Sequence, residues 1–260
     1  MDSLYIVMPA YNEEKCIEKV VKQWYPLLEG KGDNSRLVVA DSGSTDRTHE
    51  ILRKICGGGY DKLEILEHTN KEHGAKVIAL YDYAIKNDID YIFQTDSDGQ
   101  TNPDEFSSFW EMRKNYEGIF GNRTKRGDGK RRKIVEKVVC WLIKIYFGVK
   151  VPDANAPFRL MRTDSVRKYL YKLPVNYKLP NIMMVVYFAC NNERISFPSI
   201  SFDARKEGRN SINIRKIITI GFESLRDFWI LRKTCVNQDE EYRDKEINTS
   251  ESDINKKTET

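Results

Sequence analysis

Short apolar runs alternate with segments of helical period along the first half of the chain. The runs at residues 4–8, 36–40, 63–66, 91–94 and 118–121 have the length and residue types of strands. Four segments between them predict amphipathic helices. In the first, over 17–28, apolar side chains recur at helical spacing, and the second, over 46–55, has Ser44 or Thr45 as its cap. The third covers 75–86, and the fourth begins at Asn102 and Pro103. This alternation predicts an α/β fold, a mostly parallel sheet flanked by helices on both faces.

The second half of the chain is less regular. It predicts an amphipathic helix over 134–147, strands over 158–161 and 195–202, and a long C-terminal amphipathic helix over 212–232. Residues 236–260 are polar and charged, with almost no aromatic residues, which predicts a disordered tail. We therefore expect one domain over 1–235, followed by that tail.

Composition narrows the class of protein. A chain of 260 residues that is 40% hydrophobic is long enough for a large core. With 43 Lys+Arg against 39 Asp+Glu, the net charge of +4 does not argue for a nucleic-acid partner. No apolar stretch reaches the roughly 18 residues of a membrane-spanning helix, so we expect a soluble chain or one that lies on a membrane surface.

The N-terminus and the cysteines point to the cytoplasm. Residues 4–9 predict a core strand, and no basic segment or cleavage site of a signal peptide precedes them. The five cysteines are scattered and form no CxxC or CxxH pair, which argues against a zinc site and favours reduced thiols. We therefore expect a cytoplasmic protein.

Polar clusters follow four of the predicted strands. They lie at residues 9–14, 41–46, 70–76 and 96–100. For any one cluster, turn residues and helix caps are an equally good interpretation. Because the carboxyl ends of parallel strands meet at one edge of a sheet, the four together predict a ligand site there.

The residues in these clusters resemble a known family. Residues 7–14 (Val-Met-Pro-Ala-Tyr-Asn-Glu-Glu) and 38–46 (Val-Val-Ala-Asp-Ser-Gly-Ser-Thr-Asp) resemble the nucleotide-binding opening of family 2 glycosyltransferases, which have the GT-A fold. Residues 94–100 (Gln-Thr-Asp-Ser-Asp-Gly-Gln) look like the metal-binding Asp-x-Asp motif of that family. The trailing Gln100 points to the branch of dolichol-phosphate mannose synthases and polyprenyl-phosphate glycosyltransferases.

Three later segments resemble the same branch. Residues 121–123, 153–159 and 205–211 are similar to its Gly-Ser-Arg, Asp-x-x-Ser-Gly-Phe-Arg and Arg-x-x-Gly-x-Ser segments. The resemblance spans residues 4–211. It departs from the pattern at Glu72, where the family often has Gly, and at Ala156 and Pro157, which replace Ser-Gly. The resemblance implies a nucleotide-binding half over 1–100 and an acceptor half over 101–235.

The resemblance also implies a nucleotide-sugar site. Its predicted members are Pro9, Ala10, Tyr11, Asn12, Glu13, Asp41, Lys76, Asp96 and Ser97. Asp41 can accept a hydrogen bond from a ring N–H of a pyrimidine, while Glu13 and the backbone of 9–11 can hold the base and ribose. Glu14 we expect in the first turn of the following helix. Lys76 either reaches the diphosphate or is a solvated first-turn lysine, and His73 we expect to be a loop residue.

A metal site is expected at the end of the fourth strand. Asp96 and Asp98 project the same way from an extended segment, and with the side-chain carbonyl of Gln100 they make a hard oxygen site suited to Mg²⁺ or Mn²⁺. The ion would bridge the diphosphate and stabilise the charge of the leaving group. Alternatively, Asp96 hydrogen-bonds the ribose or donor sugar and Asp98 alone is the direct ligand.

The acceptor half offers a basic run and one acidic candidate. We expect Arg123, Arg131, Arg159 and Arg205 to receive an acceptor phosphate. The basic run over 123–133 is alternatively a solvated loop, and it lacks the interleaved aromatic residues of an RNA-binding surface. Asp153 is the candidate catalytic base or acceptor positioner, or else a turn residue after Pro152, while Asp98 serves catalysis through the metal.

These features predict a metal-dependent, inverting glycosyltransferase that uses a UDP- or GDP-sugar. The expected acceptor is a polyprenyl phosphate at the cytoplasmic face of a membrane, with the apolar faces of helices 134–147 and 212–229 resting on the bilayer or packed in the core. A saccharide acceptor in cell-surface polysaccharide synthesis is the main alternative. A non-catalytic sugar-nucleotide-binding protein and a nucleotidyltransferase are the others.

Overall fold

The computed structural model of the protein describes residues 1–127, 129–204 and 226–235. The chain divides into two compact units, residues 1–211 and 212–260. The described part of the second unit, 226–235, is helical. The predicted helix over 212–232 therefore lies outside the described residues as far as 225, and the predicted tail over 236–260 lies outside them entirely.

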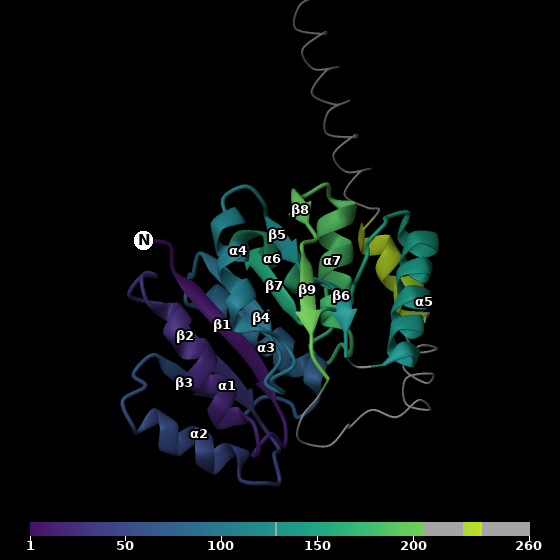
Figure 1. Cartoon of the computed structure of the whole chain (residues 1–260). Helices are drawn as coiled ribbons and strands as arrows, with labels where there is room; N and C mark the ends of the chain where they lie inside the picture. The colour runs from purple at the N-terminus through teal and green to yellow at the C-terminus, as the bar shows by residue number, and fades with distance from the viewer. Residues whose placement is uncertain (128, 205–225, 236–260) are drawn as a thin grey trace, which may run out of the picture. The chain divides into compact units, whose positions relative to one another are not determined.

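In the described residues, the central sheet of the first unit has seven strands in the order β3-β2-β1-β4-β7-β5-β8 (Figure 1). Strands β1 (Leu4–Ala10), β2 (Arg36–Asp41), β3 (Leu63–Leu66) and β4 (Tyr91–Thr95) are parallel. β7 (Phe158–Arg162) runs antiparallel between β4 and β5 (Gly118–Phe120), and β8 (Ile195–Ser196) is parallel to β5. The expected mostly parallel sheet is confirmed.

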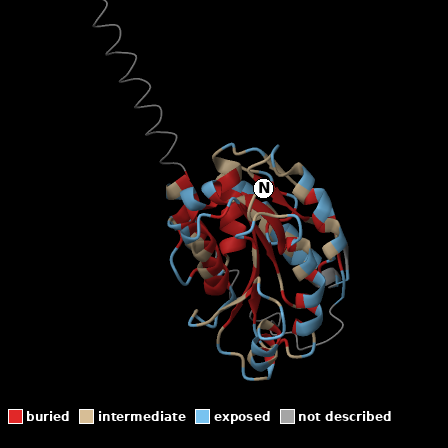
Figure 2. Ribbon diagram, turned by 90° about the vertical axis from the view of Figure 1, so that its left-hand side faces the viewer, coloured by how far each residue is buried: buried red, intermediate tan, exposed pale blue. Residues whose placement is uncertain are grey.

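The central strand β1 shows why the apolar runs form this sheet. All seven of its residues are buried, as expected for a strand that is covered on both faces. Pro9, which cannot donate to a neighbouring strand, is tolerated because the register with β4 ends at Val7 and only β2 pairs with β1 beyond it. Figure 2 shows the buried strands enclosed by helices whose outward sides are exposed.

Helices cover both faces of the sheet. On one face, α1 (Ile17–Trp24), α2 (Thr48–Cys56) and α4 (Phe106–Met112) share a core cluster with the alternate β1 residues Leu4, Ile6 and Met8. Aromatic rings fill its centre, where Phe93 lies 5.4 Å from Trp24 and 4.8 Å from Phe158 between ring centroids. On the other face, α3 (His73–Lys86) contacts β1 and β2 and packs against α6 (Thr163–Leu170) and α7 (Pro180–Cys190).

Several boundaries differ from the sequence expectation. The first helix ends at Trp24 and continues as a 3₁₀ turn, η1 (Tyr25–Leu28), that has Pro26 in its first turn. A second 3₁₀ turn, η2 (Pro103–Glu105), precedes α4, and Asn102 caps it as predicted by accepting from the Asp104 N–H. The strand expected over 195–202 is two strands, β8 and β9 (Ser199–Phe202), because Pro198 between them has no N–H to donate.

The chain from 121 to 153 forms a substructure at the side of the sheet. β6 (Asn122–Arg126), which the sequence pattern missed, pairs in parallel with β9 in a two-stranded sheet. The helix expected over 134–147 is α5 (Lys130–Phe147), which begins earlier and ends at Gly148 in the left-handed conformation, with φ of 73°. In the described ranges, no helix combines the length and the apolar character needed to cross a membrane.

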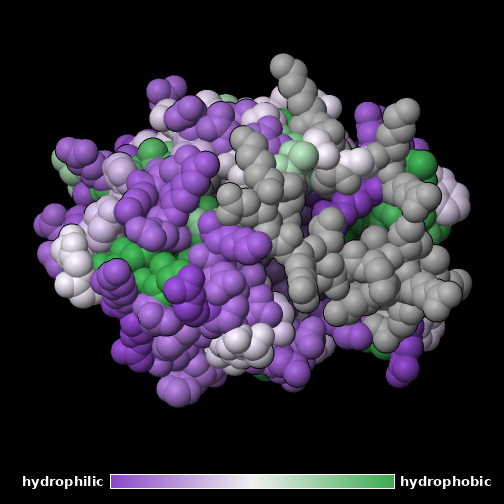
Figure 3. All heavy atoms as spheres, turned by 60° about the horizontal axis from the view of Figure 1, so that its bottom comes forward, coloured by the Kyte–Doolittle hydropathy of each residue, from purple (hydrophilic) through white to green (hydrophobic). Residues whose placement is uncertain are grey.

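Strand order decides where the polar clusters meet. β2, β1 and β4 are adjacent and parallel, so the loops after all three emerge at one edge of the sheet. This edge lies toward the bottom of Figure 1. Figure 3 turns it toward the viewer and shows a mostly hydrophilic surface that is interrupted by a hydrophobic patch.

Candidate nucleotide-sugar site

The loops after β1 and β2 are tied together at this edge. Asn12 has a left-handed backbone, with φ of 57°, a conformation that asparagine tolerates. Its side-chain carbonyl accepts from the Thr45 N–H at 2.7 Å, and its own N–H donates to Ser44 Oγ at 3.1 Å. The N–H of Glu13 donates to Thr48 Oγ1 at 2.8 Å. These bonds hold the two loops as one unit, so Asn12 has a structural role beside the predicted ligand role.

Asp41 ends β2 and is 4% exposed. Ser44 Oγ donates to its Oδ1 at 2.5 Å, and His49 Nδ1 lies 3.2 Å from its Oδ2. His49, in the first turn of α2, is a site residue that sequence reasoning missed. The available signal was its position one helical turn beyond the Asp41 cluster.

Two acidic residues follow β1 and differ in their surroundings. Glu13 is buried, and its carboxylate accepts from Cys16 Sγ at 3.2 Å. Glu14 accepts from the Arg47 N–H at 3.2 Å and so joins the β1 and β2 loops. The expectation that Glu14 lies in the first turn of the helix is wrong, because α1 begins at Ile17 and its first-turn acid is Glu18.

Lys76 lies beneath the end of β1, in α3. Its side chain is 1% exposed, and its amine donates to the Ala10 carbonyl at 2.5 Å and lies 5.3 Å from the centroid of the Tyr11 ring. Burial lowers the pKa of Lys76 to about 8, against the opposing charges of Asp41 and Glu72. The hydrogen bond to Ala10 uses one of the three donors of the ammonium group, and through it Lys76 fixes the end of β1.

The segment after β4 carries the acidic pair. Asp96 Oδ1 lies 3.4 Å from Gln94 Nε2, and Asp98 Oδ1 accepts from the Gln100 N–H at 3.1 Å. Ser97 is buried and donates to the Pro9 carbonyl at 2.8 Å, which ties this segment to β1. The side-chain amide of Gln100 donates to the Asp203 carbonyl at 2.7 Å, so this predicted ligand holds the segment against the end of β9.

His73 is the first residue of α3 rather than a loop residue. Its Nε2 lies 3.3 Å from Asp96 Oδ1. Desolvation by the surrounding protein acts to lower the pKa of His73, but the hydrogen bond and charge of Asp96 outweigh it and leave the pKa raised. His73 therefore joins the third polar cluster to the acidic pair.

The acidic pair fits a divalent cation that shares its coordination with a substrate. Within the described ranges, no three His, Cys, Asp or Glu side chains are grouped closely enough to hold a metal ion on their own. Mg²⁺ and similar hard cations are commonly bound by one or two carboxylates together with phosphate oxygens and water. Asp96 and Asp98 would supply the carboxylates for such an ion.

A second cluster surrounds Arg123 in β6. Its guanidinium makes two hydrogen bonds to Asp153, at 2.7 and 2.8 Å, and a third to Glu136 Oε2 at 3.1 Å. Glu136 Oε1 also accepts from the Ala154 N–H at 2.8 Å. Burial and the charge of Asp153 raise the pKa of Glu136. Asp153 is thus held in a buried ion pair, and Glu136 on α5 is a member of the cluster that sequence reasoning missed.

Of the other arginines predicted to bind phosphate, the structure describes the side chain of Arg159 alone. Arg159 is 1% exposed, and it donates to the backbone carbonyls of Ala156 and Asn181. Burial lowers its pKa, while the charges of Asp153 and Asp96 act in the opposite direction. Arg159 therefore lies between the two clusters, inside the protein. The side chain of Arg131 and the whole of Arg205 lie outside the described residues.

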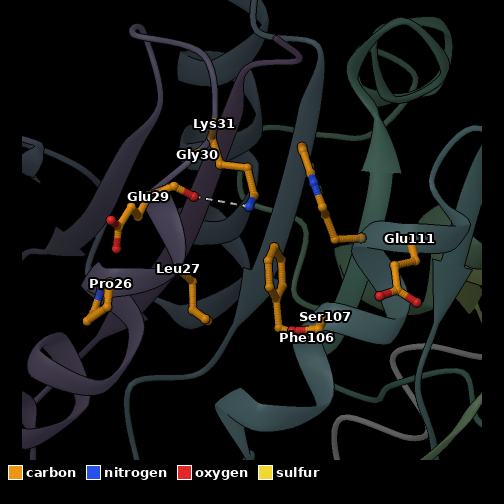
Figure 4. A pocket seen from close by; sticks show the side chains of 9 residues that line it. Pro26, Leu27, Glu29, Gly30, Lys31, Phe106, Ser107 and Glu111 are labelled. Carbon is orange, nitrogen blue, oxygen red and sulfur yellow. Dashed lines mark hydrogen bonds between the residues drawn. The ribbon is translucent and has the colours of Figure 1, made fainter.

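A pocket of about 480 Å³ lies elsewhere, between η1 and α4 (Figure 4). Its lining includes Leu27, Lys31, Phe106 and Trp110, and none of the predicted site residues. The Lys31 amine lies 4.9 Å from the centroid of the Trp110 ring and donates to the Glu29 carbonyl at 3.3 Å. This pocket is therefore separate from the edge where the polar clusters meet.

The family model described as "Glycosyl transferase family 2" matches residues 5–170, more than half of the chain. The chain belongs to glycosyltransferase family 2. The match begins in β1 and ends with α6, so it includes both the acidic pair and the Arg123 cluster. The resemblance stated from the sequence is confirmed.

Two similar proteins have a polyprenyl compound in their names. The chain is 23% identical over 220 residues to the undecaprenyl-phosphate 4-deoxy-4-formamido-L-arabinose transferase of Edwardsiella ictaluri, covering 84% of this chain and 65% of the relative. It is 23% identical over 174 residues to the polyprenol monophosphomannose synthase of Mycolicibacterium smegmatis, covering 63% of each. The chain thus spans less than two thirds of the length of either relative.

Solved structures share the fold. Glucosyl-3-phosphoglycerate synthase of Mycobacterium tuberculosis, in complex with Mn²⁺ and UDP-glucose, superposes with a TM-score of 0.65 at 18% identity over 87% of this chain and 79% of that one. At this identity the likeness concerns the fold, and it confirms the expected GT-A architecture for this family 2 member.

Proposed function

We propose that the protein is a metal-dependent glycosyltransferase that moves a sugar from a nucleotide-sugar donor to a polyprenyl phosphate. The observation that carries the proposal is the adjacency of β2, β1 and β4, which brings Asp41, the 9–13 loop and the Asp96/Asp98 pair to one edge of the sheet. The names of the two relatives, which both contain a polyprenyl compound, support this choice of acceptor.

The donor would lie along this edge. Asp41 and the loop from Pro9 to Glu13 hold the base and ribose, and Asp96 and Asp98 face the diphosphate. A divalent ion bound there, Mg²⁺ or Mn²⁺, supplies positive charge to the leaving nucleoside diphosphate. The glucosyl-3-phosphoglycerate synthase solved with Mn²⁺ and UDP-glucose supports this arrangement by analogy of fold.

The reaction we propose is a single displacement with inversion. An oxygen of the acceptor phosphate attacks the anomeric carbon, and the bond from that carbon to the diphosphate oxygen breaks on the opposite face. A phosphate acceptor is already anionic, so its attack needs little or no help from a catalytic base. The engagement of Asp153 by Arg123 is compatible with such a reaction.

One observation favours a second candidate, transfer to a saccharide hydroxyl. Two of the arginines expected to receive the acceptor phosphate, Arg123 and Arg159, donate to groups of the protein itself. A hydroxyl acceptor needs a carboxylate to take its proton, and Asp153 and Glu136 are the nearby carboxyl groups. Under this candidate Asp153 remains the proposed base.

Product extraction separates the two candidates. The protein is incubated with radiolabelled UDP- or GDP-sugars, Mn²⁺ and vesicles that contain a polyprenyl phosphate. We expect label to enter the organic phase only when the lipid is present, and to be lost on addition of EDTA. Label that appears only in a water-soluble oligosaccharide would favour the second candidate. A separate incubation with UTP or GTP and a sugar 1-phosphate that released inorganic pyrophosphate would indicate nucleotidyl transfer and contradict both.

We also propose that α5 rests on the cytoplasmic face of a membrane. Ile134, Val138, Trp141 and Ile145 recur at helical spacing and are all exposed, Trp141 by 61%. Exposed lysines flank this stripe at 133, 137 and 144, and an anionic leaflet attracts such charges.

We expect the wild-type protein to float with anionic vesicles. The Trp141→Glu variant should no longer float, whereas a control variant at an exposed residue elsewhere, Val175→Glu, should still do so. Equal flotation of both variants would contradict the role of α5.

A further inference from the structure

We propose that Gln100 is a positioning residue that joins the acidic pair after β4 to β9 and, through Phe202, to the Arg123 cluster. It acts through the N–H of its side-chain amide, whether or not the amide oxygen also binds a metal ion. This inference rests on the proposed function, in which the acidic pair faces the diphosphate and the Arg123 cluster belongs to the acceptor half.

Gln100 is joined to Asp203, the residue after β9, by two hydrogen bonds. Its side-chain amide nitrogen donates to the Asp203 carbonyl at 2.7 Å, and its backbone carbonyl accepts from the Asp203 N–H at 2.9 Å. Because a carbonyl oxygen only accepts, the amide atom that faces it must be the nitrogen. Gln100 is 5% exposed, so its side chain has little access to water as an alternative partner.

Gln100 also contacts the acidic pair. Its backbone N–H donates to Asp98 Oδ1 at 3.1 Å, so the same residue bonds this carboxylate and the end of β9. A second contact holds β9 here, because the Ser201 N–H donates to Glu105 Oε1 at 2.9 Å. Ser201 and Asp203 are two residues apart and turn their backbone groups to the same side of the strand. One edge of β9 is thus bonded to the segment after β4.

The other edge of β9 faces β6, beside which it lies in Figure 1. Phe202 turns its carbonyl to this side and accepts from the Gly127 N–H at 2.7 Å. The centroid of its buried ring lies 5.2 Å from the guanidinium carbon of Arg123, within the range of a cation–π contact. A continuous series of contacts therefore runs from Asp98 through Gln100 and β9 to the Arg123 cluster.

Glutamate at position 100 separates this role from that of a metal ligand. It has the length of glutamine and keeps an oxygen for an ion, but an ionised carboxylate has no N–H for the Asp203 carbonyl and repels it. A residue that serves only as a ligand should tolerate Gln100→Glu. A positioning residue should not, because displacing a group of the site by about 1 Å can reduce the rate about a hundredfold.

Binding and kinetics of the whole chain test the proposal at pH 8, where a carboxyl group with the usual pKa of about 4.3 is ionised. Calorimetry measures Mn²⁺ affinity in the presence of UDP or GDP, whichever binds the wild type more tightly. Initial rates use the matching radiolabelled donor with the polyprenyl phosphate vesicles. Gln100→Glu should keep Mn²⁺ affinity and the donor KM within about threefold of the wild type, while kcat falls about tenfold or more.

The control Asn102→Ala removes the cap of η2, in which Asn102 accepts from the Asp104 N–H, and leaves the contacts of Gln100 in place. It should lower Tm, with kcat and Mn²⁺ affinity within about twofold of the wild type. Retention of more than roughly half of the wild-type kcat by Gln100→Glu would overturn the inference, as would an equal loss in Asn102→Ala.

Hydrogen exchange of the wild type provides a measurement that does not depend on the folding of a variant. Addition of the nucleotide and Mn²⁺ should slow amide exchange over 199–203 as well as over 96–100, because the two segments are bonded together. Slowing confined to 96–100 would overturn the inference and leave the proposed function in place. If neither nucleotide binds in the presence of Mn²⁺, the proposed function itself fails.

Discussion

At the scale of single residues, a buried amine supports the end of β1. Lys76 donates to the Ala10 carbonyl from inside the protein, at the point where β1 gives way to the 9–13 loop. Burial keeps its pKa near 8, below the ordinary value of about 10.4. Holding the charged form there costs stability, and the cost disappears once the amine loses its proton.

The lowered pKa of Lys76 makes the free energy of unfolding depend on pH. Between about pH 8 and pH 10.5 the unfolded chain retains the Lys76 proton that the folded protein releases, so stability rises with pH. The free energy of unfolding of the wild type should gain about 3 kcal/mol relative to Lys76→Met over this window. Urea unfolding at a series of pH values measures it, with Lys54→Met as the control for loss of a positive charge. A constant difference would contradict this account.

The acidic pair gives a second prediction for a single residue. If Asp98 is a direct metal ligand, Asp98→Asn removes one of the two carboxylates offered to the ion, and turnover should fall at least about a hundredfold. The exposed Asp104 in η2 provides a matched control, Asp104→Asn, with turnover expected within twofold of the wild type. Initial rates at saturating Mn²⁺ and donor measure both. A residual rate above a tenth of wild type for Asp98→Asn would count against the ligand role.

At the scale of elements, one side chain of α5 joins three parts of the chain. Glu136 contacts both Arg123 in β6 and the backbone of Ala154, so it links a helix, a strand and the segment before β7. The same helix carries the exposed apolar stripe on another side. Because Arg123 bonds both Glu136 and Asp153, a movement of α5 would change the surroundings of Asp153.

Truncation of Glu136 should show how much its hydrogen bonds contribute to the free energy of unfolding. Glu136→Ala leaves the Ala154 N–H without its acceptor and removes one partner of Arg123, which we expect to destabilise the protein by about 2 kcal/mol. Glu136→Gln keeps an oxygen for Ala154 and should cost about 1 kcal/mol or less, because the raised pKa of Glu136 already favours a neutral group. Denaturant unfolding compares both with Lys137→Gln on the exposed side. Equal losses in the two Glu136 variants would contradict this picture.

At the scale of the whole molecule, three strands that are far apart in sequence supply one site. β1, β2 and β4 each add a loop to the same edge of the sheet, so under the proposed function the donor should contact loops from all three strands. A ligand that binds only the folded chain stabilises all of it by mass action.

This coupling predicts the response to ligands. UDP with Mn²⁺ at about 100 times its dissociation constant should add about 2.7 kcal/mol, which corresponds to several degrees in Tm. UDP or Mn²⁺ alone should give much less, because each supplies part of the other's coordination. Thermal melting with and without EDTA measures the effect, and Asp98→Asn should lose the part that depends on the metal. A shift equal to the sum of the separate shifts would contradict a shared site.

The fold, and the meeting of the polar clusters at one edge of the sheet, were predictable to a large extent. The apolar runs that became β1, β2, β3 and β4 were recognised because their pattern is local. The place of Asp41, Asp96 and Asp98 at one edge followed from parallel strand direction. β6 was missed because its sequence, Asn-Arg-Thr-Lys-Arg, contains no apolar run. β7 lies between β4 and β5 and runs antiparallel to both. Its position in the sheet could not be predicted from a local sequence pattern.

By itself, the sequence determined the α/β alternation, the family and the acidic residues at the ends of β2 and β4, since these depend on short-range periodicity and on motifs of a few residues. Only the tertiary structure decided what each charged side chain contacts. Arg123 meets Asp153 across 30 residues, and Arg159 meets Asn181 across 22. Such pairs form because a buried charged group without a partner is costly, and the nearest partner in space is set by packing rather than by sequence separation.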